Sequence, residues 1–218
     1  MKNIVIILNI LVLIVGGCRQ SLYAQFKIPT GFSELKNSPA NGQSMKRICT
    51  DFDGDGKKDT ATIIEKNDSE LQCYFLIYLT GSNKNYIIKM FERNNDFVYP
   101  IQLSVKKNVI QFAYFGEGTS VFFRGLKLRY NYTKQKIQLI GYDSGYKIYY
   151  GGSCTKSYNL LTGDYIVTNW FYEYINSKEV KRKIVNKGNK KMNDIFVENI
   201  NNELLEQLDL AGNEFELE

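Results

Sequence analysis

The chain of 218 residues contains no histidine, and this absence removes whole classes of chemistry. Histidine is the commonest general base in enzymes and the commonest zinc ligand. Catalysis by Ser-His-Asp or Cys-His groups is therefore excluded. The four cysteines also form no C-x-x-C pair. We expect a protein that is not an enzyme.

Proline and tryptophan are scarce, with three and one residues, whereas the chain has sixteen tyrosines and thirteen phenylalanines. Aromatic and β-branched residues favour strands. With 44% hydrophobic and 23% charged residues, the composition is that of an ordinary globular protein. The chain is long enough for one domain with a substantial core. We therefore expect a mainly β protein.

Long hydrophobic runs are also lacking, except for residues 4–15, which are too few to span a bilayer. Lys2 precedes this run and two glycines with Cys18 follow it, which is the layout of an export signal. Residues 14–18 resemble a bacterial lipobox, which implies lipidation of Cys18 and anchoring to a membrane facing the periplasm or the cell surface. The alternative is cleavage after Ala24, which would give a secreted soluble protein.

If this signal is present, the chain divides into three segments. We expect a lipoprotein signal peptide at 1–17, a loosely attached tether and entry segment at 18–45, and one β-rich domain at 46–218. The domain holds Cys49, Cys73 and Cys154, so at most one disulfide forms within it. Cys73 shares the pleat face of a strand-like run with apolar residues, which predicts a buried thiol. A bridge from Cys73 to Cys49 stays open.

Short strand-like runs, separated by turn residues, fill most of the domain. The number and spacing of these runs predict an antiparallel sandwich or a barrel-like sheet of about ten short strands, with a bulge near Gly125. Leucines at helical spacing between residues 200 and 208 predict one short C-terminal helix that ends at Gly212. The expected strands are residues 61–66, 73–80, 86–92, 98–106, 109–115, 120–130, 136–143, 156–161, 165–175 and 180–185.

Charge is nearly balanced overall but uneven along the chain. Removal of residues 1–17 leaves 27 basic and 23 acidic residues, which is too mild a balance to imply a nucleic-acid partner. Residues 178–191 hold seven basic residues and one acid, whereas residues 192–218 hold eight acids and no base. We expect a basic hairpin screened by its own acidic tail, with a membrane-binding or polyanion-binding patch as the alternative.

The densest cluster of acids is D-F-D-G-D-G-K-K-D at residues 51–59. Its carboxylates repel one another unless a cation lies among them. Calcium takes six to eight oxygen ligands with tolerance for irregular geometry, and two glycines allow the backbone to wrap around an ion. This spacing predicts calcium ligands from the side chains of Asp51, Asp53, Asp55 and Asp59 and from the carbonyl of Lys57. An ordinary Asp/Gly turn without metal is the alternative.

Over about sixteen residues this loop resembles the D-x-D-G-D-G-x-x-D loops of FG-GAP (integrin-type propeller) repeats, and it is similar to loops of dockerins and EF-hands. The resemblance implies a calcium-binding loop that leads into a β-hairpin. An EF-hand would have glutamate at the twelfth place, where this chain has Thr62, and helices on both sides. A propeller needs several such loops, and this chain has one.

The leading functional hypothesis is an exported, lipid-anchored, non-catalytic calcium-binding domain that binds an envelope protein, a glycan or another macromolecular partner. A second hypothesis is a glycoside hydrolase that uses two carboxylates, for which Glu117 and Asp143 are candidates. A third is a sugar-binding module, for which the glycine- and tyrosine-rich loop at 141–152 offers Tyr146, Tyr149 and Tyr150.

Overall fold

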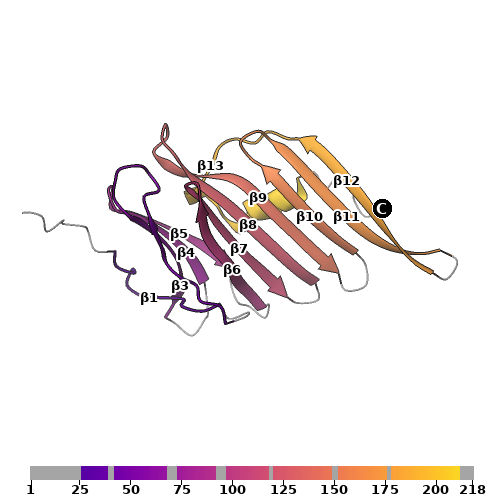
Figure 1. Cartoon of the computed structure of the whole chain (residues 1–218), viewed down its shortest axis with the longest axis horizontal. Helices are drawn as coiled ribbons and strands as arrows, with labels where there is room; N and C mark the ends of the chain where they lie inside the picture. Colours follow the sequence, from indigo (N-terminus) through magenta and orange to yellow (C-terminus); the bar gives the residue numbers. More distant parts are fainter. Residues whose placement is uncertain are drawn as a thin grey trace, which may run out of the picture.

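The computed structural model describes residues 26–38, 42–67, 73–91, 97–117, 120–148, 152–175 and 178–211, and the statements below concern these residues. They form two antiparallel sheets, of five and eight strands, with a helix near the C-terminus (Figure 1). The expected signal peptide, Cys18 and the expected helix end at Gly212 lie outside the described residues.

The smaller sheet contains β1 (Phe32–Glu34), β2 (Ile48–Thr50), β3 (Asp59–Lys66), β4 (Cys73–Leu79) and β5 (Lys84–Phe91). Its order is β1-β3-β4-β5, and β2 also pairs with β3. Strand β1 pairs with residues 64–66 of β3 and β2 with residues 59–61, so the two share one edge of β3. Phe32–Glu34 of the entry segment, which was expected to be loosely attached, therefore belong to this sheet.

The larger sheet is a series of hairpins in the order β12-β11-β10-β9-β8-β7-β6. These strands are β6 (Phe97–Lys106), β7 (Val109–Glu117), β8 (Ser120–Asn131), β9 (Lys136–Ile148), β10 (Gly152–Asn159), β11 (Asp164–Ile175) and β12 (Lys178–Asn189). A short strand, β13 (Ile195–Phe196), pairs with β9 next to the start of the β9–β10 pairing.

The core lies between the two sheets. Alternate residues of each strand point inward, as the period of a strand requires. Phe75 of β4 stacks on Phe112 of β7 with ring centroids 4.9 Å apart, and both side chains are almost fully buried. Burial of aromatic side chains of this size supplies much of the stabilisation of such a core.

The helix α2 (Asn202–Leu210) packs on the inner face of the larger sheet, behind β8, β9 and β10 in Figure 1. Asn201 caps its start by accepting a hydrogen bond from the Leu204 amide (2.9 Å). A single-turn helix, η1 (Val197–Asn199), precedes it. Leu205 and Leu208 are buried, so the predicted apolar side of this helix is confirmed.

Buried polar groups hold the C-terminal end of α2 on the sheet. Arg124 of β8 donates to the Asp209 carboxylate (2.6 Å and 2.9 Å), and the Tyr142 hydroxyl of β9 donates to its other oxygen (2.6 Å). The ammonium of Lys156 on β10 donates to the carbonyls of Leu208 and Asp209. These carbonyls belong to the last turn, which lacks partners within the helix.

The predicted mainly β fold is confirmed. All ten expected strands are present, although β10 starts at Gly152 instead of residue 156, and the sheets form a sandwich instead of a closed barrel. Three short strands, β1, β2 and β13, were not predicted. The register shift of β8 lies at Lys127/Leu128 instead of Gly125. Cys73 is buried as predicted, and Cys49 is exposed and forms no disulfide with it, so the open bridge is absent.

Candidate metal centre

The aspartate loop connects β2 to β3 and is organised by its own carboxylates. Both oxygens of Asp51 accept backbone hydrogen bonds, from Gly54 (2.6 Å) and Gly56 (2.9 Å). Gly54 and Gly56 have φ of 77° and 82°, a conformation in which glycine has no steric penalty. The sequence alternation of aspartate and glycine is therefore what lets the chain curl around the Asp51 side chain.

Asp59, the last aspartate of the loop, is fully buried. Its two oxygens accept hydrogen bonds from the amides of Phe52 (2.8 Å) and Thr80 (2.8 Å). Phe52 itself lies in the core with 1% of its surface exposed. Asp59 thus joins the start of the loop, the start of β3 and the turn after β4 in one buried contact.

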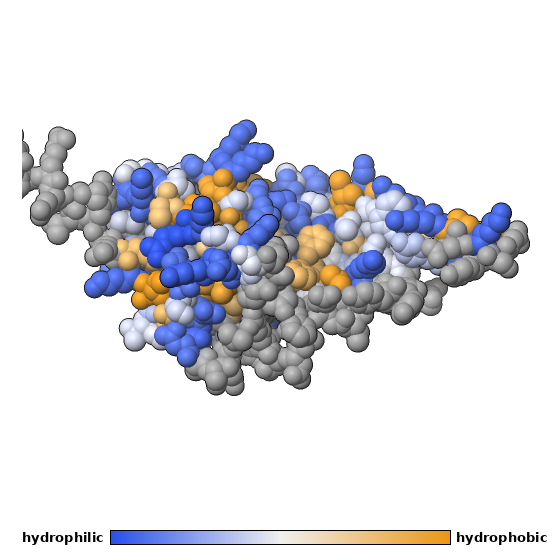
Figure 2. All heavy atoms as spheres, turned by 60° about the horizontal axis from the view of Figure 1, so that its bottom comes forward, coloured by the Kyte–Doolittle hydropathy of each residue, from blue (hydrophilic) through white to orange (hydrophobic). Residues whose placement is uncertain are grey.

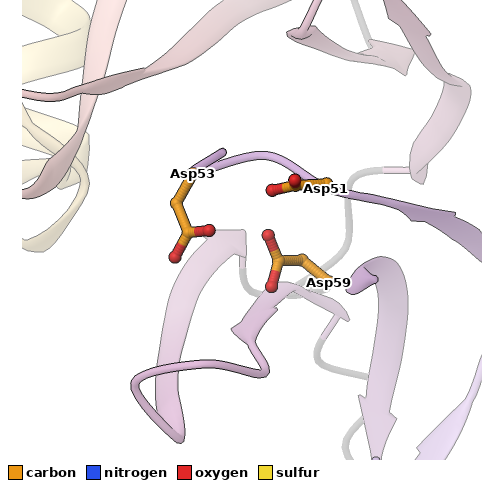
Figure 3. A group of neighbouring side chains, drawn as sticks. All are labelled: Asp51, Asp53 and Asp59. Atoms are coloured by element: carbon orange, nitrogen blue, oxygen red, sulfur yellow. The ribbon is translucent and has the colours of Figure 1, made fainter. Parts of the chain in front are cut away.

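Asp51, Asp53 and Asp59 point toward one another (Figure 3). One carboxylate oxygen from each lies within 4.8 Å of the other two. Three carboxylates at this spacing form a set of hard oxygen ligands that could hold a metal ion. The candidate site therefore takes two residues from the loop and one from the first position of β3.

The local electrostatics favour a bound cation. Burial and the nearby Asp59 carboxylate raise the pKa of Asp53 above its ordinary value. Burial also raises the pKa of Asp59, although the hydrogen bonds from Thr80 and Phe52 oppose this change. Both shifts mean that the ionised forms are disfavoured in the folded protein until a positive charge is supplied.

The fourth predicted carboxylate, Asp55, does not join this group. One of its oxygens accepts from the Lys57 amide (2.8 Å), and the other lies against Gly81 in the turn between β4 and β5, where a Cβ atom would overlap it. The carbonyl of Lys57, the fifth predicted ligand, stays a prediction. The structure thus brings together three of the four predicted carboxylates.

Two neighbouring turns support the loop, and sequence reasoning did not identify them as part of the site. Thr80, in the β4–β5 turn, donates from its hydroxyl to the Lys58 carbonyl (2.5 Å) and from its amide to Asp59. Tyr132, in the β8–β9 turn, lies beside Gly54. The hairpin register could have placed Thr80 opposite the loop, because β4 pairs back on β3, whereas no sequence signal pointed to Tyr132.

The residues proposed for the other two functions lie apart. Asp143 pairs with Lys127 (2.5 Å) on the outer face of the larger sheet and accepts from Ser157 (2.7 Å). Asp143 pairs with Gly125 of β8, and Gly125 pairs in turn with Ala113 of β7. Glu117 lies four residues beyond Ala113 along β7. The backbones of Asp143 and Glu117 are therefore separated by on the order of 16 Å. The two carboxyls of a glycosidase pair lie only about 5–9.5 Å apart.

The expected glycine- and tyrosine-rich loop is mostly strand. Residues 141–148 belong to β9, and Tyr142 is fully buried. Burial, together with the Asp209 carboxylate, raises the pKa of Tyr142, so its hydroxyl stays protonated and donates to Asp209. Tyr146 is 45% exposed, whereas Tyr149 and Tyr150 lie outside the described residues.

Three of the acids that follow the basic hairpin have partners on other strands within the described part of the chain. Asp194 accepts from Gln138, Glu198 pairs with Lys136, and Asp209 pairs with Arg124. All three partners lie on β8 or β9, so the expected screening of β12 by its acidic tail is not made by these residues. Glu203 and Glu206 lie in α2, and the acids at 214, 216 and 218 lie outside the described residues.

Comparison of the chain with protein-family models, characterised proteins and solved structures found no match. The resemblance of the loop to FG-GAP repeats therefore rests on residues 51–59 and the hairpin that follows them. None of the described helices is both long enough and apolar enough to cross a membrane.

Proposed function

We propose that this protein is an exported, lipid-anchored, non-catalytic domain that binds one structural calcium ion and presents its β sandwich to a macromolecular partner or an envelope component. The observation that carries the calcium part is the convergence of Asp51, Asp53 and Asp59 within 4.8 Å. Three carboxylates in an irregular loop suit calcium better than magnesium, which demands near-ideal octahedral geometry.

The ion would act on the structure of the loop instead of on a reaction. Asp59 links the loop to β3 and to the β4–β5 turn, so a cation held there ties three segments together. We assign the first ligands to the three converging aspartates. Asp55 and the Lys57 carbonyl complete the shell only if the Asp55 side chain turns away from Gly81.

Thermal melting tests the calcium proposal. Calcium that binds the folded loop alone should stabilise by RT ln(1 + [Ca]/Kd), about 1.4 kcal/mol at ten times Kd. With a Kd on the order of 10⁻⁴–10⁻³ M, the melting temperature should rise at millimolar calcium and rise less with magnesium. The variant Asp53→Asn/Asp55→Asn should lose the rise, whereas Asp194→Asn, a matched change outside the loop, should keep it. A wild-type melting curve that is identical in chelator and in about 10 mM calcium contradicts the proposal.

The anchoring proposal has a separate test. Cys18→Ala should release the protein from membranes, because the burial of acyl chains in the bilayer is lost. Incorporation of radiolabelled palmitate that survives this substitution contradicts lipidation at Cys18. A mature chain that starts at Gln25 supports the secreted alternative.

A further inference from the structure

Strands β11 and β12 form a ribbon that extends beyond the rest of the larger sheet (Figure 1). The last residue pair between β10 and β11 joins Gly152 to Phe171. The ribbon continues for four more pairs, from Tyr172 with Lys181 to Ile175 with Lys178. A two-stranded ribbon is marginally stable in water without further contacts.

This ribbon carries apolar and basic side chains on both of its faces. On one face Lys181 and Lys183 lie over the Trp170 ring, with their ammonium groups 4.1 Å and 5.1 Å from its centroid. On the other face Arg182 pairs with Glu173 (2.9 Å). Between these bases, hydrophobic side chains are 36–45% exposed, and hydrophobic and hydrophilic patches alternate on this end in Figure 2. These side chains are Ile166, Phe171, Tyr172, Ile175, Val180, Ile184 and Val185.

The outer edge of β12 borders both faces of the ribbon. This strand ends the order of the larger sheet, and among the described residues no strand pairs with its outer side. An edge strand offers unpaired N–H and C=O groups to an added strand. A strand added there would place alternate side chains beside the bases of one face and then of the other.

Three occupants of this edge can be compared on physical grounds. A second copy of β12 would set its bases opposite those of the first, and like charges directly opposite one another are destabilising. A flat membrane surface suits an element with a single apolar face, whereas this ribbon is mixed on both faces. An extended segment in which acids alternate with aliphatic residues pairs with the backbone edge, places its acids beside the lysines of one face and covers exposed apolar side chains of the other.

We infer that the outer edge of β12 is a docking site for an extended polypeptide segment of a partner, in which glutamate or aspartate alternates with aliphatic residues. The partner strand pairs with the β12 backbone, places its carboxylates beside Lys181 and Lys183 on one face, and places its aliphatic side chains beside Val180 and Ile184 on the other. This inference deepens the partner-binding part of the proposed function and rests on it. Lysines on an edge strand also discourage neutral strands from pairing, which makes the edge selective.

Binding of a labelled peptide tests this docking site on the full exported chain. The probe is fluorescein-Gly-Gly-Glu-Val-Glu-Val-Glu-Val-Glu, and the control peptide has lysine in place of each glutamate. Fluorescence polarisation should show binding of the acidic peptide alone, weakening as salt rises. Lys181→Glu/Lys183→Glu should weaken it roughly tenfold or more, because attraction becomes repulsion. Lys106→Glu/Lys147→Glu changes the net charge equally on other strands and should leave binding unchanged.

Amide hydrogen exchange gives a readout that a general charge effect would not move. The β12 amides that point away from β11 should exchange quickly in the free protein and slowly with the acidic peptide. Lys181→Gln, a milder change, keeps the test valid if the charge-reversal variant fails to fold. The inference is overturned if the peptide protects no β12 amide, or if both double variants bind equally. It is also overturned if removal of residues 212–218 exposes amides that were already protected, or if phosphatidylglycerol vesicles bind the ribbon and the peptide does not.

The calcium response of the same sample separates this inference from the calcium proposal. If the protein melts identically with and without calcium but binds the peptide at β12, the calcium proposal is contradicted and the docking site is supported. If calcium raises the melting temperature but the peptide does not bind at β12, the calcium proposal is supported and the docking site is contradicted.

Discussion

The aspartate loop carries a cluster of carboxylates and the β11–β12 ribbon a cluster of basic side chains, at opposite ends of the molecule and in different geometries (Figure 1). In the loop, three carboxylates converge on one point within 4.8 Å. On the ribbon, Lys181, Arg182 and Lys183 are spread over two faces. A single ion can neutralise a converging cluster, whereas only an extended ligand can neutralise a spread one. The arrangement of charges therefore distinguishes a metal centre from a docking surface.

The two regions also differ in how much of the fold depends on them. Asp59 is buried and accepts two backbone hydrogen bonds, whereas the Arg182–Glu173 pair is about half exposed. A buried carboxylate that satisfies two amides cannot be removed without leaving those amides unpaired. An exposed ion pair exchanges its contacts for contacts with water at little cost.

The largest expected effect is that of Asp59→Ala. We expect a loss of about 2–4 kcal/mol in the free energy of unfolding, because the Phe52 and Thr80 amides lose their buried acceptor. Denaturant unfolding in chelator measures this loss without any contribution from calcium. A loss below about 1 kcal/mol would show that the loop does not depend on Asp59.

Asp53 and Asp55 should differ in their effects on calcium binding. Asp53 lies in the converging group and Asp55 lies against Gly81. Asp53→Asn should therefore remove the calcium-induced stabilisation of about 1.4 kcal/mol at ten times the wild-type Kd, whereas Asp55→Asn should keep most of it. Melting curves of the two variants at matched calcium measure this difference. Equal losses would instead support the full D-x-D-G-D ligand set predicted by the sequence motif.

The buried Lys156 should make the free energy of unfolding depend on pH. Burial lowers the pKa of Lys156 from 10.5 to about 8. The unfolded chain holds this proton more tightly than the folded protein does. The contribution of Lys156 to the free energy of unfolding is therefore complete above about pH 10.5 and falls as the pH drops through about 8. Urea unfolding between about pH 7 and 9.5, below the range in which tyrosines ionise, should show this rise.

The control for this pH dependence is Lys156→Met, which keeps a long side chain without the charge. This variant should lack the rise, whereas Lys181→Met on the ribbon should keep it. A wild-type curve with no rise between these pH values would mean that Lys156 keeps an ordinary pKa and that burial does not perturb it.

Prediction from sequence was strongest where the signal is local. The alternation of apolar residues located ten strands, and leucines at helical spacing located α2 and its buried side. The aspartate spacing identified Asp51, Asp53 and Asp59, because the turn that unites them is encoded within nine residues. Each of these features is set by residues that lie close together in the sequence.

Contacts between distant segments could not be predicted in the same way. Asp209 meets Arg124 and Tyr142 across separations of 85 and 67 residues, and nothing in the sequence pairs them. Tyr146 was expected in a glycine- and tyrosine-rich loop, yet β9 continues through residue 148 as a strand. Asp55 faces Gly81 because the β4–β5 turn lies there, which the motif alone does not contain.

The smallest expected effect is that of Arg182→Ala on the ribbon. Its ion pair with Glu173 is exposed on both sides, so the free energy of unfolding should change by no more than about 0.5 kcal/mol. Chemical denaturation measures this change, with Glu173→Ala as the matched removal of the other partner. A loss above about 2 kcal/mol would mean that the ribbon is held by this pair and is not a free surface.

The most direct test of the central claim is a calorimetric titration of the chelator-treated protein with calcium. If Asp51, Asp53 and Asp59 form a metal centre, the titration should show one calcium ion per chain, with a Kd on the order of 10⁻⁴–10⁻³ M, and Asp53→Asn should abolish the heat of binding. Heat that persists unchanged in Asp53→Asn, or the absence of binding by the wild type at about 10 mM calcium, would contradict the assignment.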